Sequence, residues 1–262
     1  MFIKLPMLLW IPAVVISLVS FASDRKELSI RFRLSIHLLC AFFVAISLVS
    51  TRYESGFFIL PFLIFFIAGT ANMYNFMDGI NGIIGITAII AFGFTAFYAD
   101  RIGADQAFVF LSMSVAATSL GFLVFNFPKA KVFMGDVGSI LLGFVFSVLI
   151  VMISNTFLDF ICMAGFLLLF YFDEVSTMAL RLRQKESLFK SHRKHLYQIL
   201  TNEIGLSHWK VSVTYGVIQI IICMTIILIS GKGYISIFLF YLCCAITLFF
   251  ISKLIRMRGS AK

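Results

Sequence analysis

Three polar side chains recur at every third position where a long apolar run ends. Asn72, Asn75 and Asp78 therefore occupy one sector of a helix, and Gly79 and Gly82 follow them. Glycines let a ligand approach the backbone closely, while amides and carboxylates at the edge of hydrocarbon are costly and become functional candidates. A polar helix end or a turn is the alternative, but a turn does not need three polar side chains on one sector. We therefore expect a ligand site here.

A second polar segment, residues 126–139, begins at Asn126 and contains Pro128, which ends a helix. Its Gly-Asp-Val-Gly-Ser stretch is typical of a tight turn that opens the next helix. Asp136 in this stretch could serve only as a cap, since an N-terminal carboxylate stabilises the helix dipole. A carboxylate beside backbone N–H groups and Lys131 is also what a site for Mg²⁺ and a diphosphate needs.

Two histidines, His192 and His195, stand three residues apart with two cations between them. Zinc binding is one alternative, but the sequence offers no second cluster of ligands for it. Imidazole beside arginine suits an anionic substrate, so a phosphate-binding or proton-handling loop is favoured. His37 and His208 lack such neighbours, and we interpret them as ordinary interfacial residues.

The elements that must position these residues are membrane helices. With 61% hydrophobic and 13% charged residues and 32 Phe, the chain carries more apolar material than one soluble core could bury. Its apolar runs approach the ~20 residues of a spanning helix, which predicts an all-α polytopic integral membrane protein with about nine transmembrane helices. The runs lie near residues 5–21, 35–50, 56–74, 83–99, 107–126, 139–155, 157–172, 212–230 and 234–252.

Lys and Arg gather in alternate loops, as they do in the short cytoplasmic loops of membrane proteins. With about nine spans, this predicts an N-terminus outside and a C-terminus in the cytoplasm. Four polar loops, near residues 22–34, 75–82, 127–138 and 173–211, then face the cytoplasm together. The first, which contains Asp24, would alone be an ordinary positive-inside loop. We expect residues 1–262 to form a single membrane-embedded domain, because the longest polar stretch is too short for its own core.

The net charge of +9 is accounted for by these loops and by contact with anionic headgroups, so nucleic-acid binding is not implied. The first run could instead be a signal peptide, since Lys4 precedes it and Ser20-Phe21-Ala22 resembles a cleavage site. One Lys is outweighed, however, by the four basic residues beyond Phe21. The five Cys lie in apolar runs without CxxC spacing and are interpreted as packing residues.

Three motifs, in this order, resemble those of the polyprenyl-phosphate N-acetylhexosamine-1-phosphate transferases, which are membrane enzymes of glycosyltransferase family 4. They are Asn-x-x-Asn-x-x-Asp-Gly at 72–79, Asn-Phe-Pro-x-Ala-Lys-Val-Phe-Met-Gly-Asp-Val-Gly-Ser at 126–139 and His-Arg-x-His-Leu-Tyr-Gln at 192–198. With Asp173 and Arg181 upstream, the last motif is most similar to the branch that makes O-antigen or capsule precursors.

The resemblance implies transfer of N-acetylhexosamine-1-phosphate from a UDP-sugar to undecaprenyl phosphate, with release of UMP. This is the first membrane step of O-antigen, capsule or other cell-envelope polysaccharide synthesis. Because the donor is a soluble anion and the acceptor a membrane lipid, the expected site lies on the cytoplasmic face of the bacterial inner membrane. Mg²⁺, or Mn²⁺ in its place, is the implied cofactor, since attack of one phosphate on another requires charge neutralisation. The sequence leaves the oligomeric state open, with a homodimer as one possibility.

Residue roles follow at the matching positions. The implied metal ligands are Asp136 and Asn75. The implied catalytic residues are Asp24, Asp78, His192 and His195. Asp24 matches the second carboxylate of the family's Asp-Asp pair, which either deprotonates the acceptor or attacks as nucleophile. The implied donor-binding residues are Asn72, Gly79, Ile80, Asn81, Asn126, Lys131, Phe133, whose ring would stack on uracil, and Arg193.

The sequence departs from the family at three points. Ser23 stands where the first Asp of the pair is expected, which puts a mechanism with two carboxylates in doubt. Asn81 replaces a second Asp, although an amide can still hydrogen-bond uracil. Relatives usually have two further helices before the first run, and losing an even number preserves the topology. The alternatives are a truncated remnant that binds nucleotide without turnover and a transporter, which would need ionisable residues within its spans.

Overall fold

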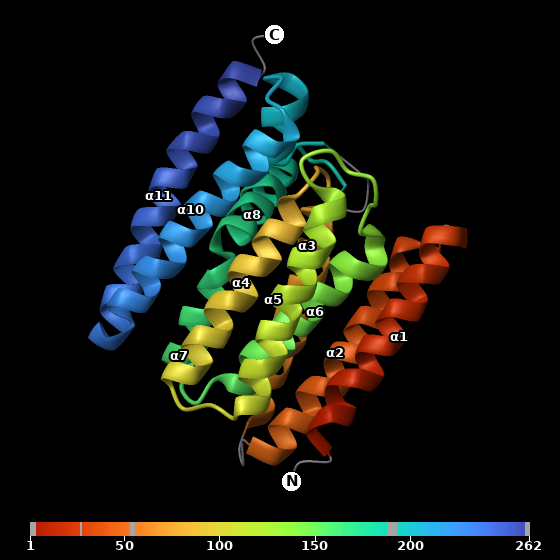
Figure 1. The fold of residues 1–262 in the computed structure, drawn as a ribbon, viewed down its shortest axis with the longest axis vertical. Helices are drawn as coiled ribbons and strands as arrows, with labels where there is room; N and C mark the ends of the chain where they lie inside the picture. The colour runs from red at the N-terminus through yellow and green to blue at the C-terminus, as the bar shows by residue number, and fades with distance from the viewer. Residues whose placement is uncertain (1–3, 27, 53–55, 188–192, 260–262) are drawn as a thin grey trace. The chain divides into compact units, whose positions relative to one another are not determined.

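The computed structural model describes residues 4–26, 28–52, 56–187 and 193–259, and this part of the chain contains helices and no strand. The α-helices are α1 (Lys4–Lys26), α2 (Ile30–Arg52), α3 (Leu60–Phe76), α4 (Ile83–Arg101), α5 (Gln106–Asn126), α6 (Gly135–Ile153), α7 (Phe157–Ala164), α8 (Leu168–Arg183), α9 (Leu196–Gln198), α10 (His208–Ile229) and α11 (Tyr234–Gly259). Short 3-10 turns are η1 (Gly56–Ile59), η2 (Gly165–Leu167) and η4 (Ser230–Lys232), and η3 (Ile199–Glu203) is a π-helical turn. Figure 1 shows their order.

Within the described ranges, seven helices are long and apolar enough to cross a membrane. They are α2, α3 with η1, α4, α5, α6, α10 with η4, and α11. The first predicted run lies in α1, and the seventh lies in α7, η2 and α8, where the helix is interrupted. The prediction of an all-α, multi-pass membrane protein is therefore confirmed. The count of nine spans and the orientation stay predictions.

The chain forms two compact units. Unit 1 comprises Met1–Asp78 and Met134–Ile153, and unit 2 comprises Gly79–Phe133 and Ser154–Lys262. The chain therefore passes from one unit to the other inside two of the predicted motifs, after Asp78 and after Phe133. The prediction of a single domain over 1–262 stays a prediction, and each unit is described by itself below.

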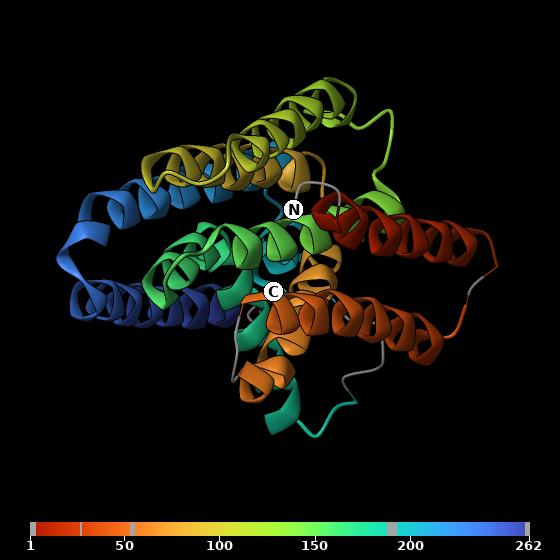
Figure 2. The same ribbon diagram turned by 90° about the horizontal axis from the view of Figure 1, so that it is seen from below.

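In unit 1, α6 packs against α1 and α3, and α2 lies beside α1 and α3 (Figures 1 and 2). Every residue from Gly143 to Ile153 is buried, as expected for a helix that is apolar on all sides. A Cβ built on Gly143 would lie 2.7 Å from the Tyr74 Cβ and 2.8 Å from the Ala71 Cα. This close crossing holds the C-terminal end of α3 beside the N-terminal half of α6.

In unit 2, α4 packs against α5 and α10, and α7 and α8 form an interrupted helix. Exposed backbone polar groups are not tolerated in hydrocarbon, so the interruption needs partners. The buried side chain of Gln219 on α10 supplies them. Its Nε2 donates to the Gly165 carbonyl at 3.2 Å, and its Oε1 accepts from the Leu169 N–H at 3.1 Å. The 3-10 turn η2 thus separates α7 from α8, and α8 carries Asp173 and Glu174.

Candidate active site

In unit 1, the carboxylate of Asp24 in the last turn of α1 lies at the N-terminus of α6. It accepts hydrogen bonds from the backbone N–H groups of Asp136 and Val137. Gly135 makes this approach possible, because its φ is +65° and a Cβ built on it would lie 3.0 Å from the Asp24 carboxylate. A helix N-terminus favours negative charge, so α1 supplies the carboxylate that this helix end binds.

The second carboxylate of unit 1 belongs to Asp136 itself and forms an ion pair with the guanidinium of Arg33 on α2. Partial burial raises the pKa of Asp24, and the charge of Asp136 raises it further. The N–H groups of α6 and the charge of Arg33 act in the opposite direction. The two carboxylates are therefore close enough to repel each other, and Arg33 offsets part of that repulsion.

Asp78 follows the C-terminus of α3, where its N–H donates to the Asn75 carbonyl at 3.1 Å. Burial raises the pKa of Asp78 to about 7, and the charge of Asp136 contributes to this rise. In unit 1, the carboxylate of Asp136 thus interacts electrostatically with two other predicted site carboxylates, those of Asp24 and Asp78. One of them changes charge near neutral pH.

The two predicted amides of α3 have different neighbours. Asn75 accepts a hydrogen bond of 2.6 Å from Ser139 Oγ, which holds it at the first turn of α6 beside Asp136. Asn72, one turn earlier, has its Oδ1 3.3 Å from His37 Nδ1 on α2 and donates to the carbonyl of Ala68 at 2.7 Å. Asn75 therefore lies at the start of α6, where its role at the metal stays a prediction, whereas Asn72 is held by α2 and its own helix.

The residues of unit 1 suit a bound Mg²⁺. Asp136, Asp24 and Asn75 offer carboxylate and amide oxygens, the donors that Mg²⁺ prefers, and the charge of Asp136 contributes, after burial, to raising the pKa of Asp24. Among the described residues, no group of three His, Cys, Asp or Glu side chains could hold a metal ion. A Mg²⁺ ion that one or two carboxylates hold together with phosphate oxygens does not need such a group, so Mg²⁺ binding here stays a prediction.

In unit 2, the turn before α4 is fixed by Gly82 and Asn126. Gly82 has φ +84°, and a Cβ there would lie 2.5 Å from the Phe127 ring. Its N–H donates to Asn126 Oδ1 at 2.7 Å, while Asn126 Nδ2 donates to the Val132 carbonyl at 2.9 Å. The buried Asn126 thereby joins the loop 79–82 to the loop 127–133, so parts of two predicted motifs meet within unit 2.

Asn81 in this loop is held from two sides. Its Nδ2 donates to the Pro128 carbonyl at 3.3 Å, and its own carbonyl accepts from Ser212 Oγ at 2.7 Å. The Asn81 N–H also donates to Nδ1 of His208, 3.4 Å away. The N-terminus of α10 therefore supports the loop. Sequence reasoning dismissed His208, and no spacing signal could have found a partner 127 positions away.

Two predicted donor-binding side chains of unit 2 are open to solvent. Phe133 is 77% exposed, which leaves the face of its ring available for stacking. Lys131 is also exposed, while its N–H donates to the Phe125 carbonyl at 2.8 Å. Ile80 is buried, so it would meet a ligand through its backbone.

The turn 193–198, which ends in the short helix α9, carries His195. Its ring is buried, with Nδ1 3.7 Å from Asp173 Oδ1 and Nε2 3.5 Å from Glu174 Oε2. The ring therefore faces two protein carboxylates, and its predicted catalytic role stays a prediction. Arg193 is exposed, as a phosphate-binding residue would be, and His192 lies outside the described residues.

Tyr197 connects this turn to the first motif. Its ring stacks on the ring of His195, with centroids 5.7 Å apart. Its hydroxyl oxygen lies so close to Gly79 that a Cβ built on this glycine would be 2.2 Å from it. Gly79 thus lets the turn 193–198 contact the loop 79–82 within unit 2. The sequence motif contained Tyr197, but its role could not be seen without this contact.

Sequence reasoning also missed two residues of unit 1. Arg33 was counted only as a loop charge and His37 as an interfacial residue, yet both lie on the side of α2 that meets the site residues. Their i, i+4 spacing was the available signal, because it places both side chains on one helix face.

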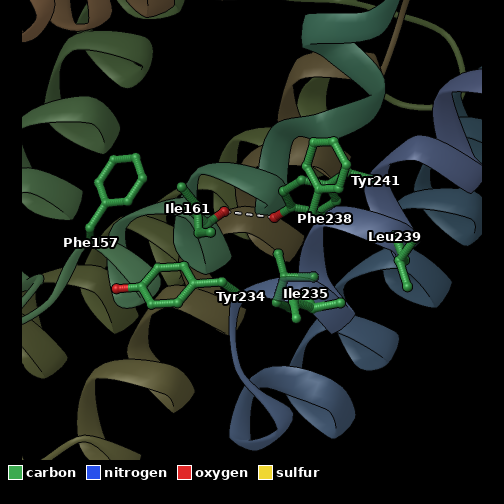
Figure 3. A pocket seen from close by; sticks show the side chains of 8 residues that line it. Phe157, Ile161, Tyr234, Ile235, Phe238, Leu239 and Tyr241 are labelled. Carbon is green, nitrogen blue, oxygen red and sulfur yellow. Dashed lines mark hydrogen bonds between the residues drawn. The ribbon is translucent and has the colours of Figure 1, made fainter.

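A cavity of about 460 Å³ in unit 2 contains none of the predicted site residues (Figure 3). It is lined by Phe157, Ile161, Tyr234, Ile235, Ile237, Phe238, Leu239 and Tyr241. The Tyr241 hydroxyl near it donates to the Ile161 carbonyl at 2.6 Å. No carboxylate, imidazole or cation is among these lining residues.

Comparison with known proteins finds similarity to transferases. The family model described as glycosyl transferase family 4 matches residues 6–154, which include Asp24, Asp78 and Asp136. A phospho-N-acetylmuramoyl-pentapeptide-transferase of Halalkalibacterium halodurans is 32% identical over 181 residues, which are 69% of this chain and 54% of that protein. A probable undecaprenyl-phosphate N-acetylglucosaminyl 1-phosphate transferase of Bacillus subtilis is 28% identical over 244 residues, 88% of this chain and 68% of that protein. The chain spans about half the length of the phospho-N-acetylmuramoyl-pentapeptide-transferases that it matches.

Proposed function

The chain belongs to glycosyl transferase family 4, and from this premise we propose that it transfers N-acetylhexosamine-1-phosphate from a UDP-sugar to undecaprenyl phosphate. UMP is the second product. The two relatives, which are named as transferases of phosphosugars, support this assignment. A multi-pass membrane protein with polar residues at its helix ends suits a lipid acceptor, and we place the reaction in cell-envelope polysaccharide synthesis, at the cytoplasmic face of the inner membrane.

The observation that carries the proposal is the position of Asp24 at the start of α6, next to the ion pair of Arg33 and Asp136. In the reaction, an oxygen of the acceptor phosphate attacks the β-phosphorus of the donor. A new P–O bond forms there, and the bond from that phosphorus to the oxygen of UMP breaks. Asp24 takes up the proton of the acceptor phosphate, for which its raised pKa suits it.

Charge neutralisation is the other requirement of phosphoryl transfer. Arg33 supplies positive charge beside Asp136, and the N–H groups at the start of α6 add their partial charge. Mg²⁺, held by Asp136 and Asn75 together with phosphate oxygens, would neutralise charge that develops on the diphosphate.

Residues of unit 2 are assigned to the donor. Phe133 offers an exposed ring for the uracil, and the exposed Lys131 and Arg193 offer cations for phosphate oxygens. Both polar atoms of Asn126 are already hydrogen-bonded to the chain, so we assign it to shaping the 79–82 loop. We assign the 79–82 loop, which includes Ile80, to the donor. Asn81, whose N–H and carbonyl are already hydrogen-bonded, and Gly79, beside which Tyr197 lies, would shape this loop.

The test uses the purified full chain in lipid nanodiscs with undecaprenyl phosphate, Mg²⁺ and a panel of UDP-N-acetylhexosamines. UMP release that requires both lipid phosphate and Mg²⁺, together with a radiolabelled sugar in the lipid fraction, is the expected result. Binding of the UDP-sugar without any UMP release across the panel would instead identify a nucleotide-binding remnant.

A further inference from the structure

Asp173 on α8 is a fully buried carboxylate to which the proposed reaction gives no role. It accepts hydrogen bonds from Leu196 N at 2.7 Å, Tyr215 Oη at 2.8 Å, Thr177 Oγ1 at 3.3 Å and Tyr197 N at 3.4 Å. Burial acts to raise its pKa, but the hydrogen bonds and charge of His195 and the other donors outweigh burial and lower it. Asp173 therefore stays charged, and an isolated buried charge would be very costly without such donors.

Two of these donors belong to one turn. The N–H groups of Leu196 and Tyr197 follow His195 directly, and the His195 ring lies between Asp173 and Glu174. Arg256 on α11 closes the turn from another side, donating to the Lys194 carbonyl at 2.8 Å and to Thr177 Oγ1 at 3.0 Å. The ionisable side chains around Asp173 thus include His195, Glu174, Arg256 and Tyr215.

The same turn contacts the loop assigned to the donor. The backbone N–H of Tyr197 donates to Asp173, and the hydroxyl end of the Tyr197 side chain lies against Gly79. Gly79 leads into Gly82, whose N–H is held by Asn126. A continuous set of contacts therefore runs within unit 2 from Asp173, through the turn, to the loop 79–82.

We propose that Asp173 is a positioning residue, which holds the turn 193–198 against the loop 79–82 through the N–H groups of Leu196 and Tyr197. Its part in the reaction rests on the proposed function, because the loop matters for turnover only if it binds the UDP-sugar. A charged anchor suits this task better than an apolar one, since hydrogen bonds fix the direction of both N–H groups.

Asp159 offers a matched control. It is also a buried carboxylate of unit 2, and it accepts a tyrosine hydroxyl, that of Tyr98, at 3.1 Å and a backbone N–H, that of Thr156, at 2.9 Å. It completes the capping box of Thr156 at the start of α7, and within the described residues its side chain bonds to Tyr98 and Thr156 rather than to the turn 193–198. Asp159→Ala therefore reproduces the loss of a buried carboxylate without loss of the anchor.

The measurement is hydrogen exchange of the full chain in nanodiscs. In Asp173→Ala, the Leu196 and Tyr197 N–H groups should exchange at least about 10-fold faster, whereas Asp159→Ala should leave them unchanged. Asp173→Asn keeps one carbonyl oxygen and should give intermediate rates, and it serves if the Ala variant does not fold. Unchanged exchange in both Asp173 variants, or equal changes in Asp159→Ala, would overturn the anchor.

Steady-state kinetics distinguish positioning of the donor loop by Asp173 from a general contribution of Asp173 to the stability of the fold. We expect Asp173→Asn to raise the KM for the UDP-sugar by about 10-fold or to lower kcat by a similar factor, with the KM for undecaprenyl phosphate unchanged. Equal loss toward both substrates would contradict positioning of the donor loop. If the wild-type chain releases no UMP but the exchange rates change as expected, the anchor stands and the proposed function fails.

Discussion

The guanidinium of Arg33 on α2 forms an ion pair with the carboxylate of Asp136 in the first turn of α6. Asp136 is the residue to which the motifs assign a metal ion, so its charge already has a protein partner when no cation is bound. Asp24 adds a second carboxylate at the same helix end. Arg33 therefore both stabilises the unliganded cluster and competes with a cation for Asp136.

Replacing Arg33 should separate these two effects. Arg33→Met should lower the melting temperature of the Mg²⁺-free protein by roughly 2–4 °C, because a half-buried pair is worth about 1 kcal/mol. It should also enlarge the rise in melting temperature on addition of MgCl₂, since the competing cation is gone. Thermal unfolding in detergent measures both, with Arg31→Met, an exposed arginine of the same helix, as the control. A smaller Mg²⁺ response in Arg33→Met would show that Arg33 does not compete for Asp136.

Part of this cluster could be predicted from sequence, and part could not. Helical spans and the motif residues Asp136 and Asn75 were predicted, because hydrophobic runs and local motifs depend on neighbours in the chain. Arg33 was missed, since its pairing with Asp136 depends on how α2 and α6 each pack against α1 and α3. A positive loop charge and an ion-pair partner look alike in sequence.

Asp78 should make Mg²⁺ binding depend on pH near neutrality. Burial and the charge of Asp136 raise its pKa to about 7, so the side chain gains its negative charge as the pH rises through that value. We expect the apparent Mg²⁺ affinity to increase by up to about 10-fold between about pH 6 and about pH 8. Titrations followed by thermal shift would measure it. Asp78→Asn should flatten the dependence, and an equally steep dependence in that variant would assign it to another group.

Gly82→Ala should damage the loop more than its backbone strain alone predicts. Gly82 has φ +84°, and an added Cβ would meet the Phe127 ring at 2.5 Å. Gly103 is a matched control, with φ +69° and no atom within 4 Å of its added Cβ. Each Ala costs about 1 kcal/mol in strain, but only Gly82→Ala should also weaken binding of the UDP-sugar by about 10-fold. Equal binding in the two variants, measured by calorimetry, would remove the loop from the donor site.

Glu174 should make the protein less stable as the pH rises. Burial raises its pKa to about 7, with His195 opposing and Asp173 adding to the rise. Because the folded pKa exceeds the ordinary 4.5, its stabilising contribution is complete below 4.5 and is lost as the pH rises through about 7. The loss is at most about 3 kcal/mol, and Glu174→Gln should remove most of it. Melting curves from about pH 5 to about pH 8 test this, with the exposed Glu203→Gln as the variant expected to follow wild type.

The polar loops illustrate the limit of sequence reasoning in unit 2. Gly79 was selected because glycine admits a ligand, yet the space beside it is filled by the Tyr197 hydroxyl. His195 was assigned to the substrate, yet its ring faces Asp173 and Glu174. The motifs indicate candidate segments, because residue types recur locally, and the assignment of these segments to the site stays a prediction. The partners lie on helices far apart in the chain, and only tertiary packing decides which atoms meet.

Asp136 gives the most direct test of the proposed reaction. If it is only a helix cap, replacing it should leave the rate of UMP release unchanged. Asp105 is a true cap, whose carboxylate accepts the Ala107 N–H at 2.9 Å at the start of α5. In nanodiscs with UDP-N-acetylhexosamine, undecaprenyl phosphate and Mg²⁺, Asp136→Asn should lower the rate of UMP release at least about 100-fold while Asp105→Asn retains it. Wild-type activity that survives in folded Asp136→Asn would contradict a reaction centred on this carboxylate.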